Sequence, residues 1–263
     1  MSYPINYPTP QGANVQIFRG GNTSSSSGIF TRDWVKPQGA SFVWFTLIGA
    51  GGGGGSGYIG AGLGYGGGGA SGNVTNFMCP AFLLPDVLQV NVGKGGLGGV
   101  YPGFSTPGVN GLNGESTQII YQQKNNTGYQ LLIASAGAGG GGSIDDTTFG
   151  SGGSGQAADV GGPMTAAGFY SATSGMQGAY GSTSVTTDAV HFLLGGSGLS
   201  AGGVISGYYG YSAADNIGYG QIQPIMQSIT GGKKSPFGAG GCGGQSNVNG
   251  NAGGDGLVII VTW

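Results

Sequence analysis

Short apolar stretches, some continuous and some alternating with polar residues, predict that this chain is built from β-strands. The clearest runs from Phe42 to Ile48, an apolar, aromatic and β-branched segment of strand length. It leads directly into the glycine tract 49–57, and the same order, a strand and then glycine, recurs along the chain. The strongest predicted strands are 41–48, 71–78, 86–92, 115–121, 129–134 and 257–263.

These strands are numerous enough for one β-sandwich. Segments 41–48 and 257–263 are apolar at nearly every position, as strands covered on both faces should be, so we expect them to be central neighbours in one sheet. The Asn and Gly residues of 124–128 predict a hairpin between two of the strands. No segment keeps a 3.6-residue period, so the fold class is expected to be all-β with little or no helix.

Two parts of the chain carry weaker patterning. From 143 to 256 only short apolar pieces remain, at 189–194, 203–205 and 222–229. Residues 1–38 are rich in proline and contain short predicted strands at 14–18 and 29–34. We expect 1–38 to be either an N-terminal arm that attaches to a partner or the first hairpin of the domain, with 39–263 forming the glycine-rich β-sandwich domain.

Glycine changes this picture, because 65 of the 263 residues are glycine. No Gly-X-Y period runs through the chain, which excludes collagen. Extended polyglycine can adopt a polyproline-II-like form and bond N–H to C=O between neighbouring chains, satisfying backbone groups that burial would otherwise leave unpaired. We therefore expect the tracts at 51–55, 66–69 and 139–142 to pack on one another or on the sandwich as polyglycine-II-like segments, with flexible loops as the alternative.

Charge and cysteine content narrow the possible functions and cellular locations of the protein. Only 6% of residues are charged, the net charge is −2, and Lys233-Lys234 is the one adjacent cationic pair, so binding to nucleic acid is not expected. A surface with so few charges protects poorly against self-association, which favours a protein that is part of a larger particle. Cys79 and Cys242 are interpreted as two free thiols, with a disulfide as the alternative, and their spacing suggests no metal site. The N-terminus has no secretion signal and no apolar run reaches the length of a membrane helix, so we expect a protein made in a host cytoplasm without membrane insertion.

Three phrases carry a family resemblance. They are Phe45 to Gly57 (FTLIGAGGGGGSG), Val90 to Gly96 (VNVGKGG) and Gly253 to Ile260 (GGDGLVII). They resemble the glycine-rich domain common in bacteriophage tail-fibre and receptor-binding proteins, over roughly residues 39–263. The chain is also similar in style to T-even-like tail-fibre adhesins, whose glycine tracts carry variable, exposed loops, although 143–194 and 204–230 are longer and less dense in glycine than such tracts.

Catalytic chemistry is not expected. His191 is the one histidine and is followed by apolar residues, which is typical of a structural histidine. Asp145 and Asp146 are adjacent, so their carboxylates point apart rather than converge as an acid–base pair, and we interpret them as a solvated turn, with a cation site as the alternative. The repeated Gly-x-Gly-x-x-Gly matches carry no weight without a βαβ context. No enzyme activity, cofactor or metal is therefore predicted.

The expected function is that of a bacteriophage virion structural protein, a component of a tail fibre or another appendage that contacts the host surface. The expected partners are other virion proteins bound through 1–38, further copies of the chain in a homo-oligomer such as a trimer, and a host cell-surface receptor. The alternatives are a non-adhesive virion component, such as a capsid decoration or head-fibre protein, and an ice-binding polyglycine bundle. The candidate receptor-contact residues are the aromatic residues of the weakly patterned second half, Phe169, Tyr170, Tyr180, Tyr208, Tyr209, Tyr211 and Tyr219. Tyrosine offers a rigid apolar face with a hydroxyl, which suits recognition. The alternative is that these rings fill gaps in the core or form a contact between subunits.

Overall fold

In the computed structural model, β-strands continue directly into extended glycine-rich runs. The described residues are 12–20, 29–122, 128–159, 163–175, 177–178, 180–181, 237–241, 243–244 and 248–263. The elements are β1 (Asn14–Arg19), β2 (Phe30–Val35), β3 (Phe42–Ile48), β4 (Tyr58–Ile59), β5 (Leu63–Gly64), β6 (Val74–Pro80), η1 (Ala81–Leu83), β7 (Val87–Val92), β8 (Thr117–Gln122), β9 (Gly128–Ala134), η2 (Pro163–Ala167), β10 (Phe169–Thr173) and β11 (Leu257–Thr262).

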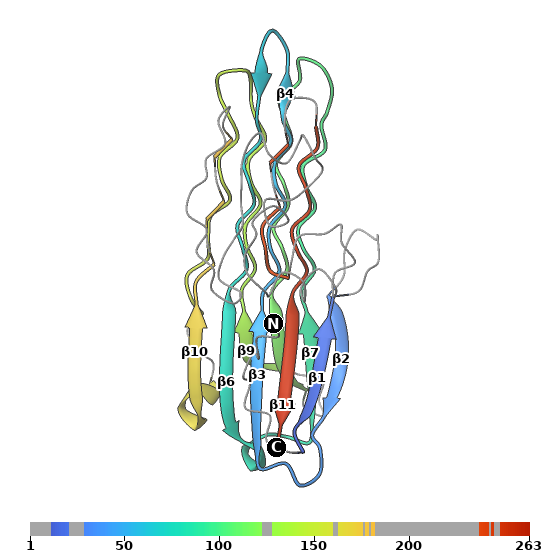
Figure 1. Cartoon of the computed structure of the whole chain (residues 1–263), viewed down its shortest axis with the longest axis vertical. Helices are drawn as coiled ribbons and strands as arrows, with labels where there is room; N and C mark the ends of the chain where they lie inside the picture. Colours follow the sequence, from blue (N-terminus) through green and yellow to red (C-terminus); the bar gives the residue numbers. More distant parts are fainter. Residues whose placement is uncertain are drawn as a thin grey trace, which may run out of the picture.

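Two antiparallel sheets form the sandwich at one end of the molecule (Figure 1). One sheet has the strand order β1-β11-β3-β6-β10 and the other the order β2-β7-β8-β9. Among the described residues the only helical segments are the short 3₁₀ turns η1 and η2. The expected all-β class with little helix is confirmed.

The predicted central pair is also confirmed. Strands β3 and β11 are antiparallel neighbours, with Phe45 opposite Ile260 and Leu47 opposite Val258. These four side chains are at most 1% exposed, because they face the second sheet across the core. Burial of each large apolar side chain contributes about 1.5–3 kcal/mol to stability, so this pair anchors the sandwich.

The N-terminal strands belong to both sheets rather than to one hairpin. β1 pairs with β11 along the edge of the five-stranded sheet, whereas β2 pairs with β7 along the edge of the four-stranded sheet. Trp34 of β2 is fully buried and makes an edge-on contact with Phe45, with ring centroids 5.8 Å apart. Both strands therefore help to close the same core. The expected pairing of 115–121 with 129–134 is present as β8 and β9.

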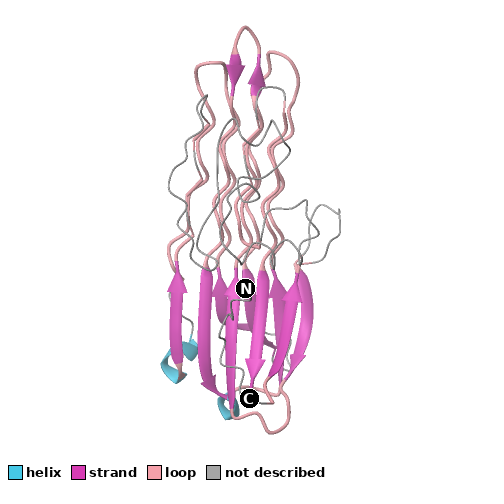
Figure 2. Cartoon of the chain, in the orientation of Figure 1, coloured by secondary structure: helices cyan, strands magenta, loops and turns pink. Residues whose placement is uncertain are grey.

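The glycine-rich runs rise together from the sandwich as an extended bundle, drawn as wavy loops above the strands (Figure 2). We call this region the glycine bundle. Its runs are 49–57, 65–73, 93–100, 108–116, 135–143 and 150–157, with 248–256 and the described parts of 174–181 and 238–244. The predicted polyglycine packing is confirmed, because Gly55 N–H donates to Gly67 O and Gly140 N–H to Gly53 O.

The run 49–57 lies at the centre of the bundle, and all nine of its residues from Gly49 to Gly57 are buried. Its N–H groups donate in rotation to three neighbouring runs and its carbonyls accept from three others, with N···O distances between 2.8 and 3.3 Å. A three-residue turn produces this rotation, since every third residue faces the same neighbour. The N–H groups of 49–57 donate to carbonyls in 67–73, 109–115 and 248–254, and its carbonyls accept from N–H groups in 96–99, 137–143 and 241–244.

Close backbone approach explains why glycine is required in this run. A Cβ added at Gly52 would overlap the carbonyl of Ala138, and one added at Gly53 would overlap the carbonyl of Leu97. Both obstacles are backbone atoms of hydrogen-bonded neighbours, so they cannot rotate away. The fold thus has two kinds of interior: apolar side chains in the sandwich, and mainly backbone with a few small buried side chains in the glycine bundle.

Candidate functional site

Three loops meet at the far end of the glycine bundle, at the top of Figure 1. We call them the tip, defined as residues 58–64, 101–107 and 144–149. Ser105 N–H donates to Ile59 O at 2.7 Å, which joins the second loop to β4. A Cβ added at Gly62 would lie 2.6 Å from the Cβ of Asp146, so the first and third loops are also in close contact. The tip is one continuous surface made by segments far apart in sequence.

Each tip loop exposes a large apolar side chain. Leu63 is 49% exposed, Phe104 70% and Ile144 58%. An exposed apolar surface carried by a rigid scaffold is typical of an interaction site, because folding gains nothing by leaving such groups in water. The tip is therefore the candidate binding surface of this chain.

Local backbone bonds fix the shape of the tip. Ser105 has a φ of 55°, and this left-handed conformation costs a residue with a Cβ about 1 kcal/mol or more. Below the tip, Tyr65 and Phe149 make an edge-on ring contact with centroids 5.7 Å apart, which ties the third loop to the bundle. The loops are thus held in one arrangement before any partner binds.

The acidic pair of the tip forms a turn, as expected. The Asp145 carboxylate accepts hydrogen bonds from Thr147 N–H at 2.8 Å and Thr148 N–H at 2.5 Å, and also from the Thr147 hydroxyl. These donors stabilise the ionised form and lower the pKa of Asp145. Among the residues that the structure describes, no group of three His, Cys, Asp or Glu side chains is placed to hold a metal ion.

The structure separates those predicted contact residues that it describes. Phe169 is 63% exposed and begins β10, in the sandwich, whereas Tyr180 is 64% exposed and lies in the glycine bundle. Tyr170 packs against the main core and its hydroxyl donates to Asp159 O at 2.8 Å. Burial raises the pKa of the Tyr170 phenol. Tyr208, Tyr209, Tyr211 and Tyr219, and also His191, lie outside the described residues.

Tyr170 belongs to a small polar network where the sandwich meets the bundle. The Asp159 carboxylate accepts from Ser135 N–H at 2.8 Å and from the Asn73 side-chain amide at 3.1 Å. Asn73 also donates to Ala157 O and is fully buried. These bonds hold the segment that leads to η2 against the sandwich, so we assign the network a structural role.

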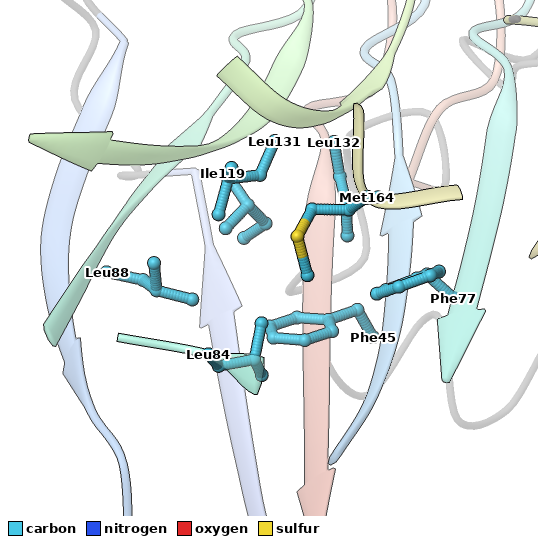
Figure 3. Close-up of a pocket in the computed structure, with 8 residues that line it drawn as sticks. All are labelled: Phe45, Phe77, Leu84, Leu88, Ile119, Leu131, Leu132 and Met164. Atoms are coloured by element: carbon cyan, nitrogen blue, oxygen red, sulfur yellow. The ribbon is translucent and has the colours of Figure 1, made fainter. Parts of the chain in front are cut away.

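The space between the two sheets is filled. Figure 3 shows Met164 of η2 reaching in between Phe45, Phe77 and Leu132. The gap among these side chains does not hold a water-sized molecule, so it is the packed core rather than a ligand site. The nearby thiol of Cys79 is free and buried, and burial raises its pKa to about 11, which leaves it unreactive at neutral pH. Cys242 lies outside the described residues.

Sequence reasoning missed the tip residues. Leu63, Phe104 and Ile144 are single apolar residues among glycine and polar residues, a pattern with no period to single them out. One usable signal was that each lies between two runs of glycine-rich sequence and so at a reversal of the chain. In the part of the chain that the structure describes, no helix is long and apolar enough to cross a membrane.

Comparison with known proteins identifies a family. The family model described as a glycine-rich domain matches residues 23–263, which is nearly the whole chain and includes β2 to β11 and the glycine bundle. The search of curated proteins found no match.

Proposed function

The chain belongs to the glycine-rich domain family, and from this premise we propose that it is a structural protein of a bacteriophage virion, a component of a tail fibre or similar appendage. In this role it contacts a receptor on the host cell surface. It carries no enzymatic activity and needs no cofactor.

The observation that carries this proposal is the exposed apolar tip at the end of an extended, glycine-rich bundle. Leu63, Phe104 and Ile144 stand on three loops that backbone contacts hold together. A receptor-binding protein needs such a surface held away from the body of the particle. The bundle supplies the distance, and the prearranged loops reduce the entropy lost on binding.

The opposite end of the molecule suits attachment to other virion proteins. Asn14 pairs with Thr262 at the end of the sandwich farthest from the tip, so the chain enters the sandwich there (Figure 1). At the same end Phe42 stacks on Trp263 and Phe82 of η1 is 81% exposed. We assign this end of the sandwich, together with the part of residues 1–38 that does not close the core, to the virion partner.

Substitution of the tip tests the proposal. The triple variant Leu63→Ser, Phe104→Ser and Ile144→Ser should lower adsorption of assembled particles to host cells by one to two factors of ten, as expected for a loss of about 1.4–2.8 kcal/mol of binding free energy. Particle assembly and the melting temperature should stay near those of the unchanged protein. Tyr129→Ser, at a 50% exposed sandwich position, is the matched control.

Two further variants separate this site from the aromatic residues predicted from sequence. Phe169→Ser with Tyr180→Ser, and Tyr208→Ser with Tyr209→Ser and Tyr211→Ser, should leave adsorption unchanged if the tip is the binding surface. Unchanged adsorption of the tip variant would reject the tip as the receptor site. Gold-labelled antibody bound at the head rather than the tail would favour the alternative, a capsid decoration or head-fibre protein.

A further inference from the structure

One side of the glycine bundle carries apolar side chains at a three-residue spacing. In the run 93–100 every third residue is outermost. The neighbouring run 108–116 exposes Val109 and Leu112 at the same spacing, each followed by an exposed asparagine, Asn110 and Asn113. The four aliphatic residues of this surface are between 40% and 63% exposed. We call it the lateral face, and its residues are Lys94, Leu97, Val100, Val109, Leu112 and Glu115.

The two runs are in register, so the lateral face consists of paired rungs. Leu112 N–H donates to Leu97 O at 2.8 Å, and Glu115 N–H donates to Lys94 O at 2.9 Å. At the next level, a Cβ added at Gly99 would overlap Val109 O, which places Val100 and Val109 side by side. From the sandwich towards the tip the rungs are therefore Lys–Glu, Leu–Leu and Val–Val.

Another exposed run of the bundle is different. In 150–157 the exposed residues are Ser151, Ser154, Gln156 and Ala157, which are polar or small. Among the described residues of the bundle, exposed aliphatic side chains therefore gather on the lateral face, with Val248 of another run also 37% exposed. Because apolar groups on a soluble rod gain stability when they leave water, this asymmetry indicates a docking surface.

We infer that the lateral face joins two copies of this chain side by side, about a two-fold axis parallel to the bundle. Such an axis exchanges the two runs and keeps every residue at its own height. Leu97 then faces Leu112 of the second copy, Val100 faces Val109, and Lys94 faces Glu115. Opposite charges therefore meet on the first rung, and apolar side chains of the same kind meet on the other two.

Two features favour a second copy over another occupant and fix its direction. The rungs repeat about every 9.3 Å, three residues at 3.1 Å each, and a surface with the same repeat is complementary along its whole length. An axis perpendicular to the bundle would instead place the Lys94–Glu115 rung against valines and leave both charges desolvated. The parallel arrangement therefore directs both tips to the same side, where two weak contacts can act together.

The test is the mass of the purified full chain, by sedimentation equilibrium at micromolar concentration. The unchanged protein should be a dimer, and Leu97→Ser with Leu112→Ser should raise the dimer dissociation constant at least about tenfold. The matched control replaces two exposed leucines elsewhere, Leu63→Ser with Leu83→Ser, and should remain dimeric. Circular dichroism and the melting temperature show that each variant is folded.

Charge exchange tests the direction of pairing. Lys94→Glu or Glu115→Lys alone should weaken the dimer about tenfold. Mixing the two single variants should restore a dimer, because within each variant chain these neighbouring residues carry like charges and only pairing between copies brings opposite charges together. A monomeric unchanged protein, a trimer, a dimer insensitive to the leucine variant, or failure of the mixture to form a dimer would each overturn the inference.

Discussion

At the scale of single residues, the tip depends on a few hydrogen bonds to one carboxylate. Asp145 is half-buried and accepts from Thr147 and Thr148, and Ile144 N–H donates to Thr148 O at 3.0 Å. The loop that presents Ile144 is thus closed by an ionised side chain. Since the pKa of Asp145 is lowered in the folded protein, its contribution is present above the unfolded value and is lost as the pH falls through the folded value.

We therefore expect acid to open the third tip loop before it unfolds the sandwich. As the pH falls below about 4, the protection factors of the Thr147 and Thr148 amides, which correct for the slower intrinsic exchange in acid, should fall, while the amides of β3 and β11 stay protected. Hydrogen exchange followed by NMR measures both groups. Asp145→Asn keeps an acceptor but cannot titrate, so its protection factors should not fall over this pH range. The same fall in that variant would assign the opening to another group.

At the scale of elements, the central run 49–57 is held almost entirely by backbone hydrogen bonds, with the Ser56 hydroxyl accepting one more from Val109 N–H. Its bonds to six neighbouring runs satisfy the polar groups that burial would otherwise leave unpaired. Ordering each residue costs about 1–2 kcal/mol of backbone entropy, and glycine loses the most freedom. Many shared hydrogen bonds and close contacts offset this cost, so the bundle tolerates little change in the spacing of its runs.

A side chain in this run should be costly for that reason. Gly53→Leu is expected to lower the free energy of unfolding by about 3 kcal/mol or more, because its Cβ overlaps the Leu97 carbonyl and no rotamer avoids this contact. Ser154→Leu adds the same side chain at an exposed position of an outer run and should change stability by less than about 0.5 kcal/mol. Urea unfolding measures both. Equal effects from the two variants would contradict close packing at Gly53.

Sequence patterns predicted the strands that bury a regular set of apolar side chains. Strands β3 and β11 carry continuous apolar runs, and the structure places them together in the core. Strand β10 was missed, because its sequence from Phe169 to Thr173 sits at a sheet edge where an exposed ring and small residues are tolerated. The hairpin of β4 and β5 was missed because a glycine-rich sequence of two-residue strands has no period to detect.

The glycine packing was predictable in kind but not in detail. Composition predicts polyglycine segments, but it does not predict which runs become neighbours, because glycine-rich runs have no side chains to distinguish one partner from another. The contacts of Gly53 with Leu97 and Gly140 therefore come from the structure alone. The tip and the lateral face follow from these pairings. Leu97 and Leu112 are fifteen positions apart, and only the register of their runs makes them neighbours.

At the scale of the whole molecule, sandwich and bundle are continuous. β3 leads upward into 49–57, β7 into 93–100 and β9 into 135–143, while β6, β8 and β11 receive runs that return (Figure 1). The position of each of these runs in the bundle is therefore set by the position in the sheet of the strand to which it is joined. We therefore expect the two regions to fold as one cooperative unit.

A cavity in the sandwich should then weaken the bundle as well. Leu47→Ala, at a fully buried core position, is expected to lower the free energy of unfolding by about 2–5 kcal/mol. Under native conditions the amides of Gly52 to Gly55 should lose exchange protection by the same free energy as the amides of β3. Mass-spectrometric hydrogen exchange resolves both segments. Bundle amides that keep their protection would show two independent units instead.

The continuity of strands and runs also has a mechanical consequence. When the tip is held and the sandwich is pulled away from it, the force acts along the runs. Hydrogen bonds between runs that lie side by side are then loaded in shear and share the force, whereas bonds at the end of a hairpin would open one after another. A bundle held mainly by hydrogen bonds between backbone groups is thus built as a tether as well as a spacer, and it can bear tension without a coiled coil.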